Sequence, residues 1–163
     1  MIIENKRVVV TGGASGIGKA LCEAFHASGA KSIVVVDINY EDAKKTADSI
    51  GGLAIQANVA VEEEIQNVIE EANKFAGGID IFCSNAGIIG VPGFMEASVE
   101  DWSNMWSVNV MSHIHAAKHV LPQMLERGEG YLVNTASAAG LLTQIGASGM
   151  LLQKMLRLVL LNG

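Results

Sequence analysis

The chain has 163 residues, half of them hydrophobic and 5% aromatic, and its formal net charge at pH 7 is −6. This length and composition suffice for one domain with a substantial core, and the lack of a basic cluster argues against nucleic acid or an anionic membrane surface as a partner. Acidic and polar residues follow Met1 almost at once, and no apolar run reaches membrane-spanning length, so we expect no signal peptide and a cytoplasmic protein.

Apolar runs of strand length alternate with longer segments of helical spacing. The predicted strands, in chain order, are Arg7–Val10, Ser32–Val36, Leu53–Ala57, Ile79–Ser84 and Tyr131–Thr135. The predicted helices are Gly16–Ser28, Tyr40–Ile50, Val61–Phe75 and one long helix from about Val99 to Glu126, in which Pro122 either introduces a kink or lies close to the end. This alternation predicts an α/β fold: a doubly wound parallel sheet that binds its ligand at the carboxyl ends of the strands.

A glycine-rich segment, Thr11–Gly18, joins the first predicted strand to the first predicted helix. Glycine lets backbone amides approach an anion closely, because no Cβ stands in the way, and the helix N-terminus adds a partial positive charge. Glycines also serve ordinary turns, but the strand before and the helix after favour a pyrophosphate site. The residues expected to hold it are Gly12, Ser15, Gly16, Ile17 and Gly18.

The second predicted strand is followed directly by Asp37, about 20 residues beyond the last of these glycines. A carboxylate there accepts hydrogen bonds from the hydroxyls of an adenosine ribose and repels a 2′-phosphate. The next residue is Ile38 rather than Arg or Lys. We therefore expect NAD rather than NADP as cofactor, the alternative being that Asp37 merely ends a strand.

Further polar residues fall where the sheet would gather them. Ser84–Gly87 follows the fourth predicted strand, and its small residues permit close approach to a ribose. Asn109 lies in mid-helix, where asparagine is slightly unfavourable, which indicates a polar role. Ser137 follows the fifth strand at the same edge, and Lys154 lies downstream on a predicted helix.

Histidines and cysteines give weaker signals. His115 and His119 are four residues apart with His113 nearby, but no local carboxylate or cysteine completes a ligand set, so we predict no metal site. Cys22 and Cys83 lie in apolar stretches, which favours buried thiols in a reducing compartment.

Taken together, these residues resemble the short-chain dehydrogenase/reductase family from residue 5 to about 148. The matching motifs are Gly12-x-x-x-Gly16-x-Gly18, Asp37, Asn58-Val59, Asp80, Asn85-Ala86-Gly87, Asn109, Ser137 and Lys154. Two departures are mild: Asn58 stands where the family usually has Asp against the adenine, and Ser84 replaces a commoner Asn.

The resemblance implies a Rossmann domain over residues 1–163 and an NAD-dependent oxidoreductase that moves a hydride between NAD(H) and an alcohol or ketone substrate. It implies a Tyr as general acid/base, with Lys154 lowering the pKa of that Tyr. Ser137 would bond the reacting oxygen and Asn109 would hold a water. Family members are usually homo-oligomers, built on the helix that this chain is expected to form at about Val99–Glu126 and on the helix after it.

The implied tyrosine is missing. In the family it stands four residues before the Lys and thirteen after the Ser, and both counts lead to Met150. A thioether cannot transfer a proton, and neither Tyr40 nor Tyr131 is placed to replace the tyrosine. The alternative function is therefore a catalytically inactive NAD-binding fragment or pseudoenzyme.

Residues from about 149 to 163 do not resemble the family, whose members also continue further, so the chain is expected to be truncated. We hypothesise a frameshift between about Gln144 and Gly149. If a T precedes the Met150 codon, reading one base earlier gives a tyrosine codon. The shifted reading frame that starts with this codon can then encode Tyr-x-x-x-Lys. Sequencing the encoding DNA tests this, the alternative being a divergent tail.

Overall fold

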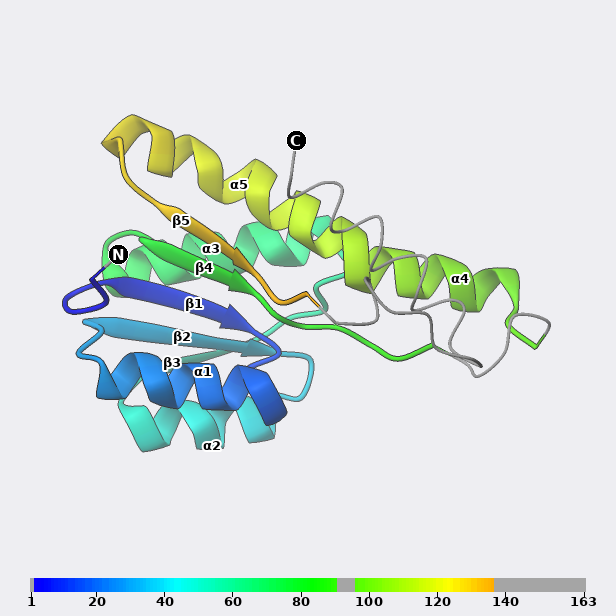
Figure 1. Cartoon of the computed structure of the whole chain (residues 1–163), viewed down its shortest axis with the longest axis horizontal. Coiled ribbons are helices and arrows are strands. Elements are labelled where there is room, and N and C mark those ends of the chain that lie inside the picture. The colour runs from blue at the N-terminus through cyan, green and yellow to red at the C-terminus, as the bar shows by residue number, and fades with distance from the viewer. Residues whose placement is uncertain (1, 91–95, 137–163) are drawn as a thin grey trace.

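The computed structural model of this chain describes residues 2–90 and 96–136. Five parallel strands form one sheet in the order β3-β2-β1-β4-β5 (Figure 1). Their bounds are β1 Arg7–Thr11, β2 Ser32–Asp37, β3 Leu53–Gln56, β4 Ile81–Ser84 and β5 Tyr131–Asn134. The helices are α1 Gly16–Ala27, α2 Tyr40–Ile50, α3 Glu62–Ala76, α4 Val99–Trp106 and α5 Ser112–Arg127. This order confirms the predicted doubly wound sheet.

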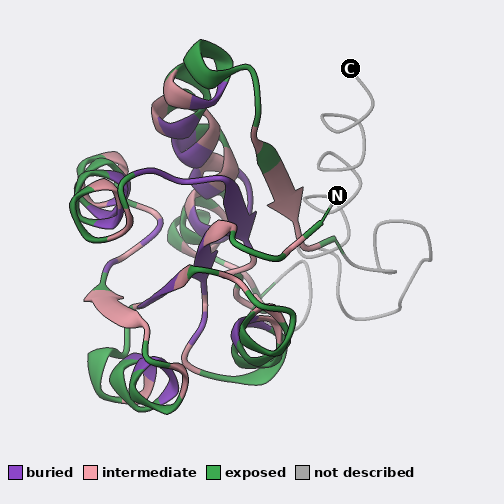
Figure 2. Ribbon diagram, turned by 90° about the vertical axis from the view of Figure 1, so that its left-hand side faces the viewer, coloured by how far each residue is buried: buried purple, intermediate pink, exposed green. Residues whose placement is uncertain are grey.

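The central strands carry apolar side chains on both faces, as a sheet covered by helices on both sides requires. Alternate residues of β1 enter opposite cores, because successive side chains of a strand point to opposite faces. Val9 packs with residues of α3 and α5, whereas Val8 and Val10 pack with residues of α1 and α2. Figure 2 shows the buried residues along the middle of the sheet and on the inner sides of the helices.

The region expected to be one long regular helix from about Val99 to Glu126 is different in the structure. A π-helical turn, Ser107–Met111, separates α4 from α5, and it contains Asn109. Pro122 lies inside α5, which continues to Arg127. A π-turn is a rare interruption that often occurs at functional sites, and here it brings Asn109 against the segment that follows β4.

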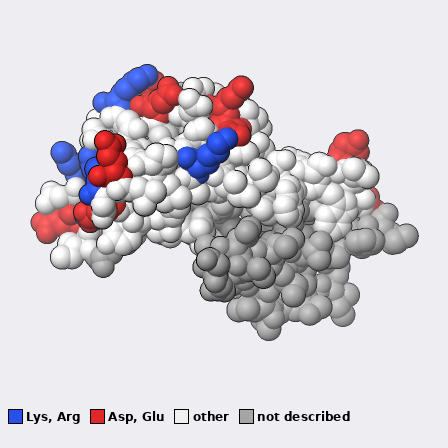
Figure 3. Space-filling view, turned by 90° about the horizontal axis from the view of Figure 1, so that it is seen from above, with Lys and Arg blue, Asp and Glu red and all other residues white. Residues whose placement is uncertain are grey.

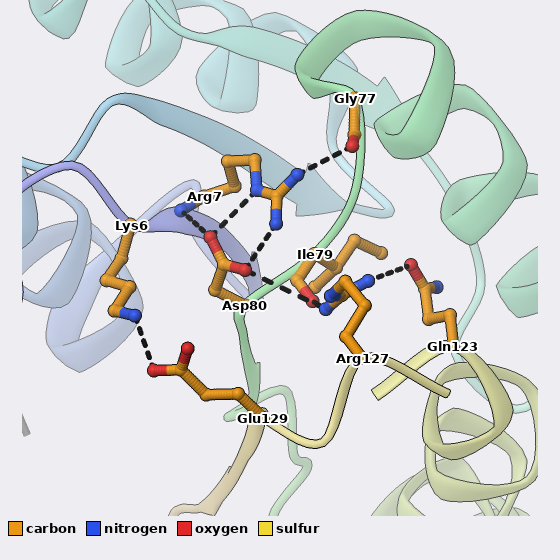
Figure 4. A network of polar contacts seen from close by, with 8 residues as sticks. All are labelled: Lys6, Arg7, Gly77, Ile79, Asp80, Gln123, Arg127 and Glu129. Carbon is orange, nitrogen blue, oxygen red and sulfur yellow. Dashed lines mark hydrogen bonds and ion pairs between the residues drawn. The ribbon is translucent and has the colours of Figure 1, made fainter. Parts of the chain in front are cut away.

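A polar network ties together the amino ends of β1, β4 and β5 (Figure 4). Asp80 accepts three hydrogen bonds from Arg7: from the backbone N (2.9 Å), from Nε (2.8 Å) and from Nη2 (2.5 Å). Arg127 at the end of α5 approaches the same carboxylate at 3.7 Å, and Lys6 pairs with Glu129. The Arg7 guanidinium holds the pKa of Asp80 below its usual value.

Replacing Asp80 by alanine is expected to lower the free energy of unfolding by about 2–3 kcal/mol, because the Asp80 side chain is largely buried and Arg7 loses its partner. The effect depends on pH with a defined sign. Because folding depresses the pKa of Asp80, its stabilisation is complete above the unfolded pKa of about 4 and is lost as the pH falls through the folded value.

Urea denaturation at pH 7 and at successively lower pH measures this difference. The matched control is Asp48→Ala, which removes an exposed carboxylate paired with Lys44 on α2 and should cost about 0.5 kcal/mol or less. Equal losses for the two variants at pH 7 would show that the network does not stabilise the sheet.

Charged side chains on the outer surface are mixed in sign. Figure 3 shows lysines and arginines beside aspartates and glutamates on one part of the described face, whereas much of the rest of that face carries no charged side chain. Among the described residues, no helix is both long and apolar enough to cross a membrane.

Candidate functional site

A cavity of about 550 Å³ opens at the carboxyl end of the sheet. All twelve residues predicted to bind a cofactor line it, as does Asn109. These twelve are Gly12, Ser15, Gly16, Ile17, Gly18, Asp37, Ile38, Asn58, Val59, Asn85, Ala86 and Gly87. Four separate strand ends contribute them, which is the arrangement that open α/β sheets use for ligand binding.

The glycine-rich turn forms the floor of this cavity between β1 and α1. Gly12 has a left-handed backbone (φ +69°), and the N–H of Gly13 donates to the carbonyl of Val36 at 3.1 Å. Ser15 is the N-cap of α1 and makes no side-chain capping hydrogen bond. The first-turn amides of a helix have no partner within the helix, so they are available to an anion bound at this end.

Asp37 lies beside the turn at the end of β2. Its carboxylate accepts hydrogen bonds from the backbone N–H groups of Ala14 and Asn39, both at 3.1 Å. These two bonds fix the carboxylate at the cavity wall and connect it to the glycine-rich turn. The neighbouring residue Ile38 is 64% exposed, so it offers an apolar surface to a ligand.

Three strand ends are joined by hydrogen bonds beside the cavity. Thr11 Oγ1 accepts from the backbone N–H groups of Asn85 (3.0 Å) and Ala86 (3.1 Å). The Asn85 side chain donates to the Thr11 carbonyl at 3.1 Å and accepts from Thr135 Oγ1 at 2.9 Å. Asn85 thus links β1, β4 and the residue after β5.

Asn109 is buried in the π-helical turn, and its side chain is hydrogen-bonded to the backbone of Ile88. Its Oδ1 accepts from the N–H of Ile88 at 2.9 Å, and its Nδ2 donates to the Ile88 carbonyl at 3.0 Å. Gly87 packs so close that a Cβ there would lie 3.1 Å from Asn109 Oδ1. Asn109 therefore holds the segment after β4 against the helix at the cavity wall.

Comparison with known proteins agrees with this geometry. Residues 6–149 match the family model described as short chain dehydrogenase. This chain belongs to the short-chain dehydrogenase family. The match to the family model begins just before β1 and ends one residue before Met150.

Two curated relatives of this chain are an uncharacterized oxidoreductase and a named dehydrogenase. It is 34% identical over 142 residues to an uncharacterized oxidoreductase, YvrD, of Bacillus subtilis strain 168, covering 85% of this chain and 53% of that protein. It is 37% identical over 156 residues to a cyclohexanol dehydrogenase of Acinetobacter sp. strain SE19, covering 92% of this chain and 62% of the relative. The chain thus spans less than two thirds of these relatives.

Solved structures share the fold over nearly the whole chain. A short chain dehydrogenase/reductase from Burkholderia phymatum in complex with NAD superposes with a TM-score of 0.95 at 27% identity, covering 99% of this chain and 59% of that one. A 7α-hydroxysteroid dehydrogenase complexed with NADH and 7-oxo glycochenodeoxycholic acid gives 0.89 at 29% identity, covering 97% and 63%.

Three predicted catalytic positions of this chain lie outside the described residues: Ser137, Met150 and Lys154. Ile88 and Ile89 also line the cavity. Four further cavity residues were not predicted from the sequence: Ala57, Val108, Thr135 and Ala136. Thr135 and Ala136 could have been predicted to line the cavity, because they lie between the fifth strand and Ser137 in the sequence.

Away from the cavity, Glu62 at the start of α3 lies among basic residues of α5. It accepts hydrogen bonds from Lys118 (2.6 Å) and His119 (2.9 Å), and it lies 3.5 Å from His115. Lys118 and His119 hold the pKa of Glu62 at about 2. The sequence did not predict that Glu62 would lie beside these histidines. Among the described residues, no group of three or more His, Cys, Asp or Glu side chains is arranged to hold a metal ion.

Both cysteines are buried free thiols, as predicted. Burial raises the pKa of Cys22 and of Cys83 to about 12. A thiol with such a pKa is not ionised near neutral pH and is therefore a poor nucleophile. These cysteines serve packing rather than chemistry.

Proposed function

We propose that the chain binds NAD in the cavity at the carboxyl end of the sheet. The observation that carries this proposal is the position of Asp37 at the cavity wall, hydrogen-bonded to the glycine-rich turn at Ala14. A dinucleotide laid across the site would place its pyrophosphate at the first turn of α1 and its adenosine ribose at Asp37. The NAD and NADH complexes of similar structures support this reading.

The same carboxylate favours NAD over NADP. A 2′-phosphate would meet the negative charge of Asp37, and the adjacent Ile38 supplies no positive charge to offset it. Titration calorimetry with NAD and with NADP tests the proposal. We expect NAD to bind at least about tenfold more tightly, which is about 1.4 kcal/mol. Equal affinities, or tighter binding of NADP, would contradict it.

We further propose that the whole protein transfers a hydride between NAD(H) and an alcohol or ketone. The names of a cyclohexanol dehydrogenase and a 7α-hydroxysteroid dehydrogenase among the similar proteins support this class of substrate. When bound, the nicotinamide supplies or accepts the hydride. Asn109 shapes the wall near Ile88, and Ser137 and Lys154 are the proposed groups for the substrate oxygen and the nicotinamide ribose.

The second candidate function is an NAD-binding chain without dehydrogenase activity. It is favoured by Met150, which stands where a proton-transferring tyrosine is implied, and by the family match, which ends at residue 149. A thioether has no exchangeable proton to give to an alkoxide. Binding of the dinucleotide and catalysis are therefore separable in this chain.

The 163-residue chain is expected to show no NADH production from cyclohexanol or other simple alcohols. The reason is the absence of a general acid/base at position 150. The measurement is NADH absorbance under saturating NAD, with a buffer blank as reference. NADH production that Ser137→Ala abolishes would overturn this expectation, because it would show a working site at the predicted serine.

A further inference from the structure

Asn58 lies in the cavity wall beyond Asp37, and its side chain bears on which base the proposed NAD site accepts. Beyond Asp37 the cavity wall is formed by Ile38, Asn58 and Val59. A base attached to a ribose at Asp37 falls in this region, where Ile38 and Val59 supply apolar surface. Asn58 is the side chain there that can distinguish one purine from another through hydrogen bonds.

Hydrogen bonds within the loop define which atom of Asn58 is left for a ligand. The N–H of Ala60 donates to Asn58 Oδ1 at 3.0 Å, and the N–H of Asn58 donates to Glu64 Oε2 at 2.7 Å. Because a backbone N–H requires an acceptor, the Asn58 atom that faces the Ala60 N–H must be the side-chain amide oxygen. Nδ2 has no hydrogen-bond partner among the described residues, so a donor remains for the ligand.

We propose that Asn58 is a specificity-determining residue that makes the base site tolerant of an oxo group at purine position 6. This inference rests on the proposed NAD site. Adenine carries an amino donor at position 6 and hypoxanthine a carbonyl acceptor. The Nδ2 donor favours the carbonyl, whereas a carboxylate in the same turn would present a second acceptor, which favours the amino group and repels the carbonyl.

The experiment compares binding of NAD and of nicotinamide hypoxanthine dinucleotide by titration calorimetry at pH 8. For each protein the ratio of the two dissociation constants, hypoxanthine form over adenine form, is the readout. In Asn58→Asp this ratio is expected to be about tenfold larger than in the unchanged chain, the size of one hydrogen bond gained and one repulsion added.

A second variant tests whether a disturbed loop, rather than the lost Nδ2 donor, could explain a change in the ratio. Asn58→Ser retains a side-chain oxygen that can accept from the Ala60 N–H, but it removes the Nδ2 donor. It should weaken binding of the hypoxanthine form about threefold or more relative to binding of NAD, so the ratio rises in this variant as well. Gln123→Glu, which adds the same charge beside Arg127 and far from the cavity, should leave the ratio unchanged.

The outcomes separate this inference from the function on which it rests. If both dinucleotides bind but the ratio is the same in the unchanged chain, Asn58→Asp and Asn58→Ser, the role of Asn58 is wrong and the NAD site stands. If neither dinucleotide binds the unchanged chain, the proposed function fails and this inference fails with it.

Discussion

Gly18→Ala is expected to abolish measurable dinucleotide binding and to lower the free energy of unfolding by about 3 kcal/mol. A Cβ at position 18 would lie 1.9 Å from the backbone oxygen of Gly12 and 2.7 Å from Asn85 Nδ2. The first of these atoms belongs to the main chain of the glycine-rich turn, which cannot swing aside as a flexible side chain could. The turn must therefore move, and with it the amides proposed to hold the pyrophosphate.

The displacement would also reach beyond the turn. Asn85 Nδ2 donates to the Thr11 carbonyl, and Asn85 Oδ1 accepts from Thr135. Pushing Asn85 away weakens the bonds that join the carboxyl ends of three strands. For this reason we expect a loss of stability together with the loss of binding, although Gly18 itself has no left-handed backbone conformation that alanine could not adopt.

NAD titration and urea denaturation of the same samples measure the two effects, with circular dichroism to show that the variant is folded. The control is Gly128→Ala at the end of α5, where φ is +71° and an added Cβ meets no atom within 4 Å. It should cost about 1 kcal/mol through backbone strain and leave NAD affinity unchanged. Unchanged NAD affinity in Gly18→Ala would refute the proposed close packing of the turn.

The sheet was the easiest part to predict, because its inner strands are nearly continuous runs of valine and isoleucine. Such runs have one physical explanation, burial on both faces, and the structure buries Val8, Val9 and Val10 almost completely. Strand ends were less accurate. The fourth strand was predicted from Ile79 and begins at Ile81, although the Asp80 backbone is already hydrogen-bonded to Arg7 and Tyr131 on either side.

The π-helical turn could not be predicted from local sequence. Residues 107–111 have ordinary apolar spacing, and the turn is associated with contacts between Asn109 and the Ile88 backbone, 21 residues away in sequence. The unfavourable mid-helix asparagine was nevertheless a correct indication that this position had polar partners. Low helix propensity singled out Asn109, but only the tertiary structure shows that its partner is the Ile88 backbone.

The candidate site and its surroundings were likewise predicted only in part. Residues in the glycine-rich turn and at the strand ends were found because topology alone brings carboxyl ends of parallel strands together. The contacts of Glu62 with His115 and His119 were not predicted, because they join α3 to α5. Sequence spacing does not show that a carboxylate of one helix lies beside the histidines of another. Such contacts depend on how two helices pack across one face.

Asp37→Ser is expected to shift the ratio of NAD to NADP affinity by about 100-fold, which is about 2.7 kcal/mol, in favour of NADP. Two changes add in this ratio. NAD loses charge-assisted hydrogen bonds between its ribose hydroxyls and the carboxylate, and NADP no longer meets a negative charge beside its 2′-phosphate. Ile38 is unchanged and offers no cation, so the variant should weaken NAD more than it strengthens NADP.

Calorimetric titration of both dinucleotides measures the ratio, and the matched control is Asp48→Ser, which removes one negative charge from the exposed face of α2 and should leave it unchanged. Asp37 also accepts hydrogen bonds from the N–H groups of Ala14 and Asn39, so a uniform loss of affinity for both dinucleotides could arise from a displaced turn. A change in the ratio cannot arise that way, because both cofactors use the same turn for the pyrophosphate. If the ratio stays within about twofold of the unchanged chain, Asp37 only ends a strand and braces the turn, and the choice of NAD must be made by other residues.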